Sequence, residues 1–232
     1  MNDRGVSGRA GTGVNPVADL ASLIDHTLLR PDASAAEVRS AVLEAVGFGC
    51  ASVCVQPAMV PAAFESAAGS LPVCAVVGFP HGANLSETKA VEASGVVALG
   101  ASEVDMVADL SALADSDYGA VASDVARVRA AVPHVLLKVI LESALWNDAQ
   151  LRAACDAALD GGADFVKTST GFHPSGGATE HAVGVMAERV GGRAMVKASG
   201  GIRDLDTARR MVDAGAARLG LSATAAILSE LS

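Results

Sequence analysis

Lysine is rare in this sequence, in which 13 of the 17 basic residues are arginine and four are lysine. Lys138, Lys167 and Lys197 lie in segments that are otherwise apolar, VLLKVIL, ADFVK and AMVK. Buried strands rarely contain a charge without a partner or a task. Lys89 lies in the polar segment ANLSETK, so we expect it on the solvated surface.

Lys167 and Lys197 each close their apolar segment and are followed by turns of small residues, KTSTG and KASGG. If the segments are neighbouring parallel strands, both amines lie at one edge of the sheet. A second ammonium nearby in an apolar interior disfavours protonation of an amine and leaves it nucleophilic, as a Schiff-base lysine must be. The alternative interpretation is that each lysine is only an ion-paired strand residue, with Asp105, Glu142 or Asp25 as counter-charge.

One acidic residue, Asp105, is a candidate proton carrier for these amines. Asp105 belongs to the segment EVDMV, and every second side chain of a strand faces the same side. If Asp105 faces the interior, it shares a pocket with Lys138 and the other two lysines and could shuttle protons directly or through a water. Its alternative role is to neutralise Lys138. Asp25, in LIDHT, is expected to end the first strand, where it could contact a substrate hydroxyl or cap a helix.

Glycine-rich turns follow the last three predicted strands, in TSTG, SGGIR and GLSA. Backbone amides at helix N-termini in such turns, with an arginine beside them, could hold a phosphate dianion. Tight turns alone would also explain the glycines. The predicted phosphate-binding residues are Gly171, Gly200, Gly201, Arg203, Gly220 and Ser222.

Eight short apolar runs alternate with Ala-rich helical stretches from Leu23 onward. Capping residues such as Ser34 and Asn147 precede the stretches, and glycines follow them. Eight strand–helix units in about 200 residues favour an α/β fold, an eight-stranded parallel TIM barrel formed by residues 16–232 as one domain. A doubly wound open sheet is the alternative. The expected strands cover residues 23–25, 51–55, 73–79, 103–108, 135–141, 163–167, 194–197 and 217–221.

The composition disfavours several function classes. The 232 residues have a formal net charge of −9 at pH 7, so no basic surface is expected for nucleic acid or for an anionic membrane. The four cysteines and five histidines lack metal-ligand spacing, so we expect no metal, and reduced thiols typical of the cytoplasm. Residues 1–15 are polar and Gly-rich and are expected to be a disordered tail, neither a signal peptide nor a membrane span.

Motifs spread from Leu23 to about Ala223 match the pattern of a known enzyme family. They are IDHTLLRPDAS, CVQP, VVGFPHGA, EVDMV, LKVILES, GADFVKTSTGF, VKASGGIR and RLGLSA. With them the chain resembles the deoxyribose-phosphate aldolases, class I aldolases with a barrel fold. The resemblance implies reversible cleavage of 2-deoxy-D-ribose 5-phosphate to acetaldehyde and D-glyceraldehyde 3-phosphate, in deoxyribonucleotide catabolism, without a metal or organic cofactor.

Position by position, the resemblance implies that Lys167 forms the Schiff base, Lys197 tunes it and Asp105 relays protons. We also expect substrate contacts from Asp25, Lys138 and Thr170. Two other classes stay open: a barrel aldolase that forms a Schiff base with a different phosphorylated sugar, and a non-catalytic protein that binds a sugar phosphate. The expected partner is a small-molecule sugar phosphate, and the chain could form a homo-oligomer.

Overall fold

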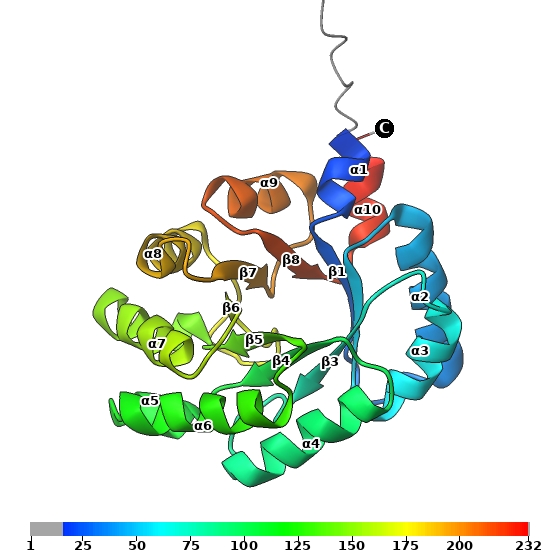
Figure 1. Cartoon of the computed structure of the whole chain (residues 1–232). Coiled ribbons are helices and arrows are strands. Elements are labelled where there is room, and N and C mark those ends of the chain that lie inside the picture. The colour runs from blue at the N-terminus through cyan, green and yellow to red at the C-terminus, as the bar shows by residue number, and fades with distance from the viewer. Residues whose placement is uncertain (1–15, 232) are drawn as a thin grey trace, which may run out of the picture.

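The structure is a computed structural model that describes residues 16–231, so the predicted disordered tail, residues 1–15, lies outside the described residues. Eight parallel strands pair in chain order and the last pairs with the first, which closes the sheet into a barrel (Figure 1). Closure confirms the predicted TIM barrel and shows that the open-sheet alternative is wrong. The strands are β1 (Ile24–Leu28), β2 (Ser52–Val55), β3 (Val73–Val77), β4 (Glu103–Val107), β5 (Leu136–Ile140), β6 (Phe165–Lys167), β7 (Met195–Ser199) and β8 (Arg218–Leu221).

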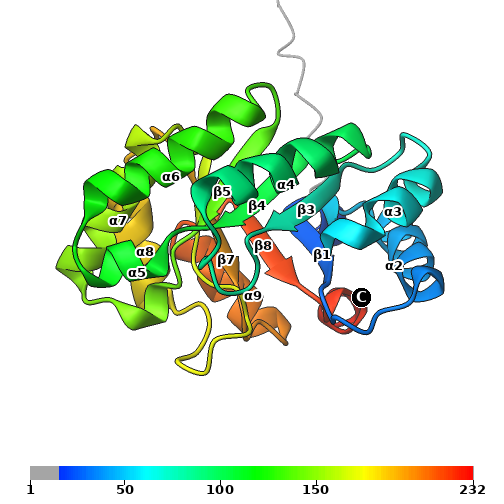
Figure 2. The ribbon, with the colours of Figure 1, turned by 90° about the horizontal axis from the view of Figure 1, so that it is seen from below.

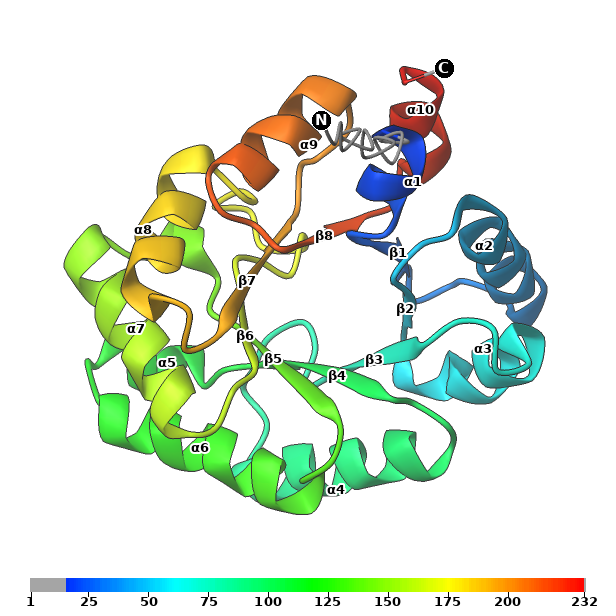
Figure 3. The ribbon, with the colours of Figure 1, turned by 45° about the horizontal axis from the view of Figure 1, so that its top comes forward.

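Helices connect successive strands and cover the outside of the barrel (Figures 2 and 3). None of those within residues 16–231 is long and apolar enough to cross a membrane. The longer helices are α2 (Ala35–Phe48), α3 (Val60–Ala67), α4 (Ser86–Ala98), α6 (Tyr118–Ala131), α7 (Asp148–Asp160), α8 (Glu180–Val190) and α9 (Leu205–Asp213). The shorter ones are α1 (Pro16–Ala21), α5 (Leu110–Ala114), α10 (Thr224–Ser229) and the 3-10 helices η1 (Pro57–Met59) and η2 (Ser143–Leu145).

Two helices begin at capping residues that the sequence indicated. Ser34 Oγ accepts a hydrogen bond from Glu37 N at 3.3 Å, and the Glu37 carboxylate accepts one from Ser34 N at 2.8 Å. Asn147 and Gln150 form the same reciprocal pair at the start of α7. These capping boxes satisfy backbone amides that a helix leaves free, so the helices after β1 and β5 begin at defined residues.

The main hydrophobic core lies between the barrel and its helices and consists largely of buried Ala, Val, Leu and Ile side chains. The inside of the barrel is different. One part of it holds a small apolar cluster of Leu29, Cys54, Cys74 and Val76. The strands carry buried charged side chains into the remaining space, and there a site can form.

Two strands extend beyond the ends predicted for them. β1 continues past Asp25 to Leu28, because the residues after Asp25 pair with β2. β7 continues past Lys197 to Ser199, because it pairs with β8 up to that residue. Lys167 ends β6 as predicted. Asp25 and Lys197 therefore lie within their strands and not at the ends, and both have no exposure.

Lys89 is buried, so the prediction of a solvated position is wrong. Its side chain has 0% exposure and lies between α4 and α6, which pack side by side (Figure 2). Its Nζ donates to Asp124 Oδ2 at 2.8 Å and to the Val107 carbonyl at 3.0 Å. The polar sequence around Lys89 did not reveal this position, because the carboxylate that compensates the charge comes from another helix.

We expect Lys89→Met to lower the free energy of unfolding by about 3–5 kcal/mol, because it leaves Asp124 buried without its cation. Urea unfolding followed by circular dichroism measures the change. Arg127→Met is the matched control, since Arg127 pairs with Glu87 across the same two helices at an exposed position. It should change stability little. Equal losses in the two variants would contradict the importance of the buried pair.

His26 predicts a pH dependence of stability. The His26 ring is buried and its Nδ1 lies 2.7 Å from Thr224 Oγ1 at the start of α10. Burial lowers the pKa of His26 below its ordinary value of 6.5, against the opposing charge of Glu44. Below about pH 6.5 the unfolded chain therefore binds the proton more readily than the folded protein, and the stability that neutral His26 provides is lost as the pH falls.

Urea titrations at pH 7.5 and 5.5 should show a larger loss of stability in the natural chain than in His26→Gln. The exposed His134→Gln is the control, because it removes one histidine without touching the buried ring. It should keep the full pH dependence. A His26→Gln variant with that same dependence would show that another group is responsible.

Candidate active site

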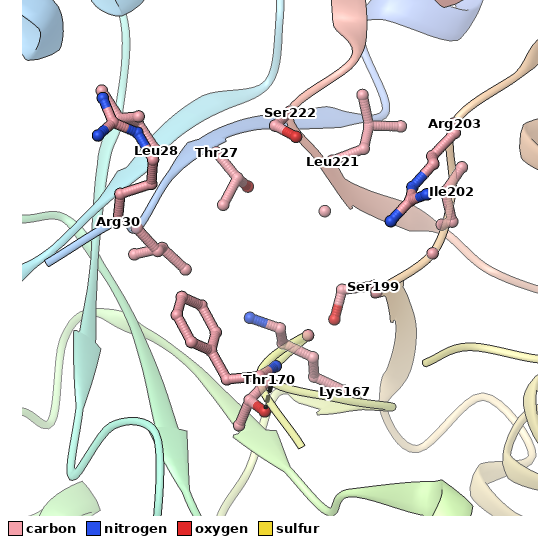
Figure 4. Close-up of a pocket in the computed structure, with 16 residues that line it drawn as sticks. Thr27, Leu28, Arg30, Lys167, Thr170, Ser199, Ile202, Arg203, Leu221 and Ser222 are labelled. Atoms are coloured by element: carbon pink, nitrogen blue, oxygen red, sulfur yellow. Dashed lines mark hydrogen bonds between the residues drawn. The ribbon is translucent and has the colours of Figure 1, made fainter. Parts of the chain in front are cut away.

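Lys167 lines a cavity of about 440 Å³ at the carboxyl ends of the strands. This is the end of a TIM barrel at which active sites form, and the volume suits a small ligand. The cavity walls come from the loops that follow β1, β6, β7 and β8. Figure 4 shows the Lys167 amine and the Arg203 guanidinium directed into the same space from different walls.

One carboxylate, that of Asp105, binds the three lysines inside the barrel. Its Oδ2 accepts hydrogen bonds from Lys167 Nζ at 2.8 Å and Lys197 Nζ at 2.7 Å. Its Oδ1 accepts from Lys138 Nζ at 2.9 Å and from Cys74 Sγ at 3.1 Å. A carboxylate has about four lone-pair positions, so these four donors saturate it. Asp105 therefore faces the barrel interior and contacts Lys138, as predicted.

A second layer of charges lies on the side of Lys197 and Lys138 away from the cavity. Asp25 Oδ2 is 2.5 Å from Lys197 Nζ, and Asp25 Oδ1 accepts a hydrogen bond from Arg218 at 2.5 Å. Glu103 Oε2 accepts one from Lys138 Nζ at 2.5 Å. Both lysines are therefore enclosed by carboxylates on two sides and have no exposure.

This charged cluster holds one more basic than acidic group. The basic members are Lys138, Lys167, Lys197 and Arg218, and the acidic members are Asp25, Glu103 and Asp105. Lys167 is the basic member that lines the cavity. An amine must be neutral when it attacks a carbonyl, and a neutral Lys167 leaves the numbers of positive and negative groups equal.

Mutual pairing keeps Asp105, Lys197 and Lys138 charged. Burial alone would raise the pKa of Asp105, but its three lysine partners hold that pKa well below the usual range. Burial would lower the pKa of Lys197, yet Asp105 and Asp25 raise it above the ordinary value. The pKa of Lys138 is raised in the same way, chiefly by Asp105. The expectation of two lysines in direct repulsion thus omitted the carboxylate oxygen that both of them contact.

Two thiols lie beside this carboxylate. Burial, reinforced by Cys54 and Asp105, raises the pKa of Cys74 well above its ordinary value, so Cys74 remains a thiol that can donate. Cys54, Cys74 and Asp105 together offer three metal-ligating atoms within 4.8 Å of one another. Three ammonium groups contact that carboxylate, and a cation would have to displace them. We therefore assign no metal ion to this cluster.

All six residues predicted to bind phosphate line the cavity, namely Gly171, Gly200, Gly201, Arg203, Gly220 and Ser222. Part of the reasoning for Gly171 is wrong, because α8 begins only at Glu180 and Gly171 lies in a long loop rather than at a helix N-terminus. Arg30 also lines the cavity, but its guanidinium is bound to Asp32 and Glu37. Arg203 is thus the arginine of the lining whose guanidinium is directed into the cavity (Figure 4).

Of the three residues predicted to contact the substrate, one lines the cavity and two do not. Asp25 and Lys138 have 0% exposure and lie beneath the cavity without lining it, so the expected direct contacts need correction. Their carboxylate and ammonium groups are bound to other side chains of the cluster. Thr170 does line the cavity, and its hydroxyl donates to Glu142 Oε2 at 2.7 Å.

Sequence reasoning gave no site role to three residues that the structure brings into it. Glu103 could have been found, because it shares a strand face with Asp105. Arg218 is a charged residue in the apolar strand RLGL, a signal of the same kind as the lysines. Cys74 gave no comparable signal, because its partners come from other strands. Glu142 contacts Thr170 and not a lysine, contrary to its expected role as a counter-charge.

Comparison with known proteins identifies the family of this chain. The family model described as DeoC/LacD family aldolase matches residues 20–229. A deoxyribose-phosphate aldolase from Mycobacterium avium is 55% identical over 218 residues, which cover 92% of this chain and 97% of the relative. One from Mycobacterium tuberculosis is 54% identical over 219 residues, 93% of this chain and 97% of the relative.

Solved structures show the same similarity. A protein from Coccidioides immitis described as a putative deoxyribose-phosphate aldolase superposes with a TM-score of 0.89 at 38% identity, over 92% of this chain and 86% of the other. The deoxyribose phosphate aldolase of Aeropyrum pernix gives a TM-score of 0.85 at 37% identity, over 92% and 91%. This chain belongs to the DeoC/LacD family of aldolases and is a relative of the deoxyribose-phosphate aldolases.

Proposed function

We propose that this protein is a class I aldolase that reversibly cleaves 2-deoxy-D-ribose 5-phosphate to acetaldehyde and D-glyceraldehyde 3-phosphate. One observation carries the proposal: the Lys167 amine faces the cavity, while the Asp105 oxygen behind it also binds Lys197. A nucleophilic amine that opens onto a cavity, with proton-carrying groups in contact, is what imine chemistry requires. The names of the Mycobacterium relatives support the substrate.

The first step is attack of the neutral Lys167 amine on C1 of the open-chain sugar. The resulting carbinolamine loses its hydroxyl as water and becomes a protonated imine. That loss consumes a proton, and Lys197, kept protonated by its two carboxylates, is the nearby reserve. Asp105 contacts both amines through one oxygen, so it can pass the proton between them without bulk solvent.

Imine formation also changes what Asp105 can do. In the free protein its four acceptor positions are occupied. A protonated imine at Lys167 keeps one N–H of the three that an ammonium has, so its contact with Oδ2 then depends on the orientation of that single N–H. When this N–H turns away from Oδ2, the carboxylate becomes available to the reacting hydroxyl, directly or through a water.

Carbon–carbon cleavage follows from the imine. The C3 hydroxyl loses its proton to the Asp105 and water system, the C2–C3 bond breaks, and its electron pair moves toward the iminium nitrogen to give an enamine. Glyceraldehyde 3-phosphate leaves. The enamine carbon then takes up a proton, and water hydrolyses the imine to release acetaldehyde and regenerate Lys167. Every step is reversible, so the same groups serve synthesis.

The phosphate end is assigned to the wall formed by the loops after β6, β7 and β8, which carry five of the six residues predicted for it, while Gly220 lies within β8. Backbone amides in these turns and the Arg203 guanidinium supply donors for a dianion. Binding energy from this remote group holds C1 near Lys167.

We also propose a cellular compartment and an oligomeric state for the enzyme. The cysteines of the described chain are free and buried, which supports a cytoplasmic protein in a reducing compartment. The Aeropyrum pernix relative is described as having a tetrameric structure, which supports a homo-oligomer here.

Borohydride reduction in the presence of 2-deoxyribose 5-phosphate should leave a stable adduct on Lys167, because hydride reduces a protonated imine to an amine. Peptide mass mapping identifies the modified residue, and Lys89, Lys138 and Lys197 serve as internal controls. Lys167→Ala should lose both adduct and turnover. An active preparation without any adduct would contradict the imine mechanism.

Product analysis separates the proposal from a Schiff-base aldolase that uses a different phosphorylated sugar. Both would trap Lys167. Only the proposed enzyme should release acetaldehyde together with glyceraldehyde 3-phosphate in equal amounts. Trapping of Lys167 without acetaldehyde formation would keep the mechanism and reject the substrate.

Arg203→Ala should raise KM for 2-deoxyribose 5-phosphate by about 10- to 100-fold, since it removes a charged hydrogen-bond donor from the phosphate wall. Turnover of unphosphorylated 2-deoxyribose should change little. Steady-state kinetics with the two sugars measures the difference. Arg39→Ala, an exposed arginine of α2 paired with Glu65, is the control. An equal change in the kinetics of both sugars would show that Arg203 does not bind the phosphate.

A further inference from the structure

Glu142 is a buried acidic residue that the proposed mechanism does not use. Its side chain has 0% exposure and lies directly after β5, at the cavity end of the barrel. Within the part of the chain that the structure describes, no lysine, arginine or histidine forms an ion pair with it. Its hydrogen-bond partners are the hydroxyl and the backbone amide of Thr170. A buried carboxylate without a cation is costly, so its position requires an explanation.

The backbone at Glu142 is also strained. Its φ of 53° and ψ of 57° lie in the left-handed region, which a residue with a Cβ rarely adopts. The neighbouring amides explain how it is held there: Leu141 N donates to the Lys167 carbonyl at 2.9 Å, and Ser143 N donates to the Thr168 carbonyl at 2.7 Å. With both neighbours bonded to the chain around Lys167, this conformation directs the Glu142 side chain toward Thr170. Such strain is concentrated at functional sites.

Glu142 fixes the turn that forms one wall of the cavity. Thr170 Oγ1 donates to Glu142 Oε2 at 2.7 Å and accepts from Phe172 N at 3.1 Å, so one hydroxyl joins the carboxylate to the turn. Thr170, Gly171 and Phe172 all line the cavity (Figure 4 labels Thr170). The Phe172 ring packs edge-to-face on Phe79 with centroids 5.2 Å apart.

The Thr170–Phe172 turn also supports the loop that follows β7. A Cβ on Gly177 would lie 2.2 Å from the Gly200 carbonyl oxygen, and one on Gly200 would lie 3.4 Å from the Gly171 Cα. Ala178 N donates to the carbonyls of Ser199 and Gly200. The backbones of the two loops are therefore in direct contact, and a shift of Thr170 would reach the wall assigned to the phosphate.

We propose that Glu142 is a positioning residue: its strained backbone and buried carboxylate hold the Thr170–Phe172 turn, and through it Gly200, in the geometry that binds the phosphorylated part of the substrate. The proposal rests on the proposed function for the identity of that substrate. The contacts described for Lys167 do not include Glu142, because β6 and Asp105 hold the amine. Glu142 thus acts on the aldehyde that carries the phosphate and not on the imine-forming carbonyl.

The test measures aldol synthesis, in which the two substrates bind separately. Glu142→Gln should raise KM for glyceraldehyde 3-phosphate about tenfold, the effect of losing one charged hydrogen bond. KM for acetaldehyde, and the rate at which borohydride traps acetaldehyde on Lys167, should stay within about twofold of the natural protein. Glu142→Gly separates the carboxylate from the backbone, since glycine adopts the observed φ without strain. It should raise the same KM.

Thr170 provides the matched variants. Thr170→Val removes the hydroxyl at nearly constant volume and should reproduce the Glu142→Gln effect, whereas Thr170→Ser keeps a hydroxyl and should restore most of the affinity. The double variant Glu142→Gln/Thr170→Val should be little worse than either single one, because the two residues act through one contact. Glu188→Gln, an exposed carboxylate of α8, is the control and should behave like the natural protein.

The outcomes are distinct. A loss of thermal stability with unchanged KM values, or equal increases in both KM values, would overturn the positioning role while Lys167 is still trapped. Failure to trap Lys167 in the natural protein would instead overturn the proposed function. A tenfold rise confined to glyceraldehyde 3-phosphate, with rescue by Thr170→Ser, would establish the role of Glu142.

Discussion

The Asp105 carboxylate binds three ammonium groups and a thiol, and the arrangement of the charged barrel interior depends on these contacts. Its donors come from β3, β5, β6 and β7, while Asp105 itself lies on β4. Strands β6 and β7 do not pair with β4, so their lysines reach the carboxylate only across the interior of a closed barrel. An open sheet would leave these charges without their partner. The charged interior therefore depends on closure of the barrel.

Burying the charged groups of this interior carries a large desolvation penalty. Replacing buried ion pairs by apolar residues of similar volume often leaves a protein as stable or more stable, so the cluster is weak evidence for stability. The fold instead draws on the large aliphatic core between strands and helices. That division lets the barrel interior serve chemistry: the outer core supplies the hydrophobic stabilisation, and the inner charges surround the one lysine that lines the cavity.

Strands and loops divide the work of the site. The strands position Lys167, Lys197 and Asp105 through register, which leaves little freedom in the reacting groups. The loops form the wall that faces the rest of the ligand, and they contact one another through Glu142, Thr170 and close glycine backbones. The reacting end and the recognition end can therefore vary separately. This separation is typical of barrel enzymes, in which loops carry specificity on a rigid frame.

The sequence by itself determined the class of fold and predicted the residues proposed to react. Eight apolar runs with caps and glycines predict the barrel, and lysines in apolar strands predict a charged interior, because both signals are local. It misplaced Lys89 and the ends of the strands that carry Asp25 and Lys197, since burial and strand ends depend on neighbouring elements. Only the tertiary structure decided that three lysines share one carboxylate and that Glu142 binds Thr170. Such contacts join residues far apart in the chain, and no local pattern encodes the distance between them.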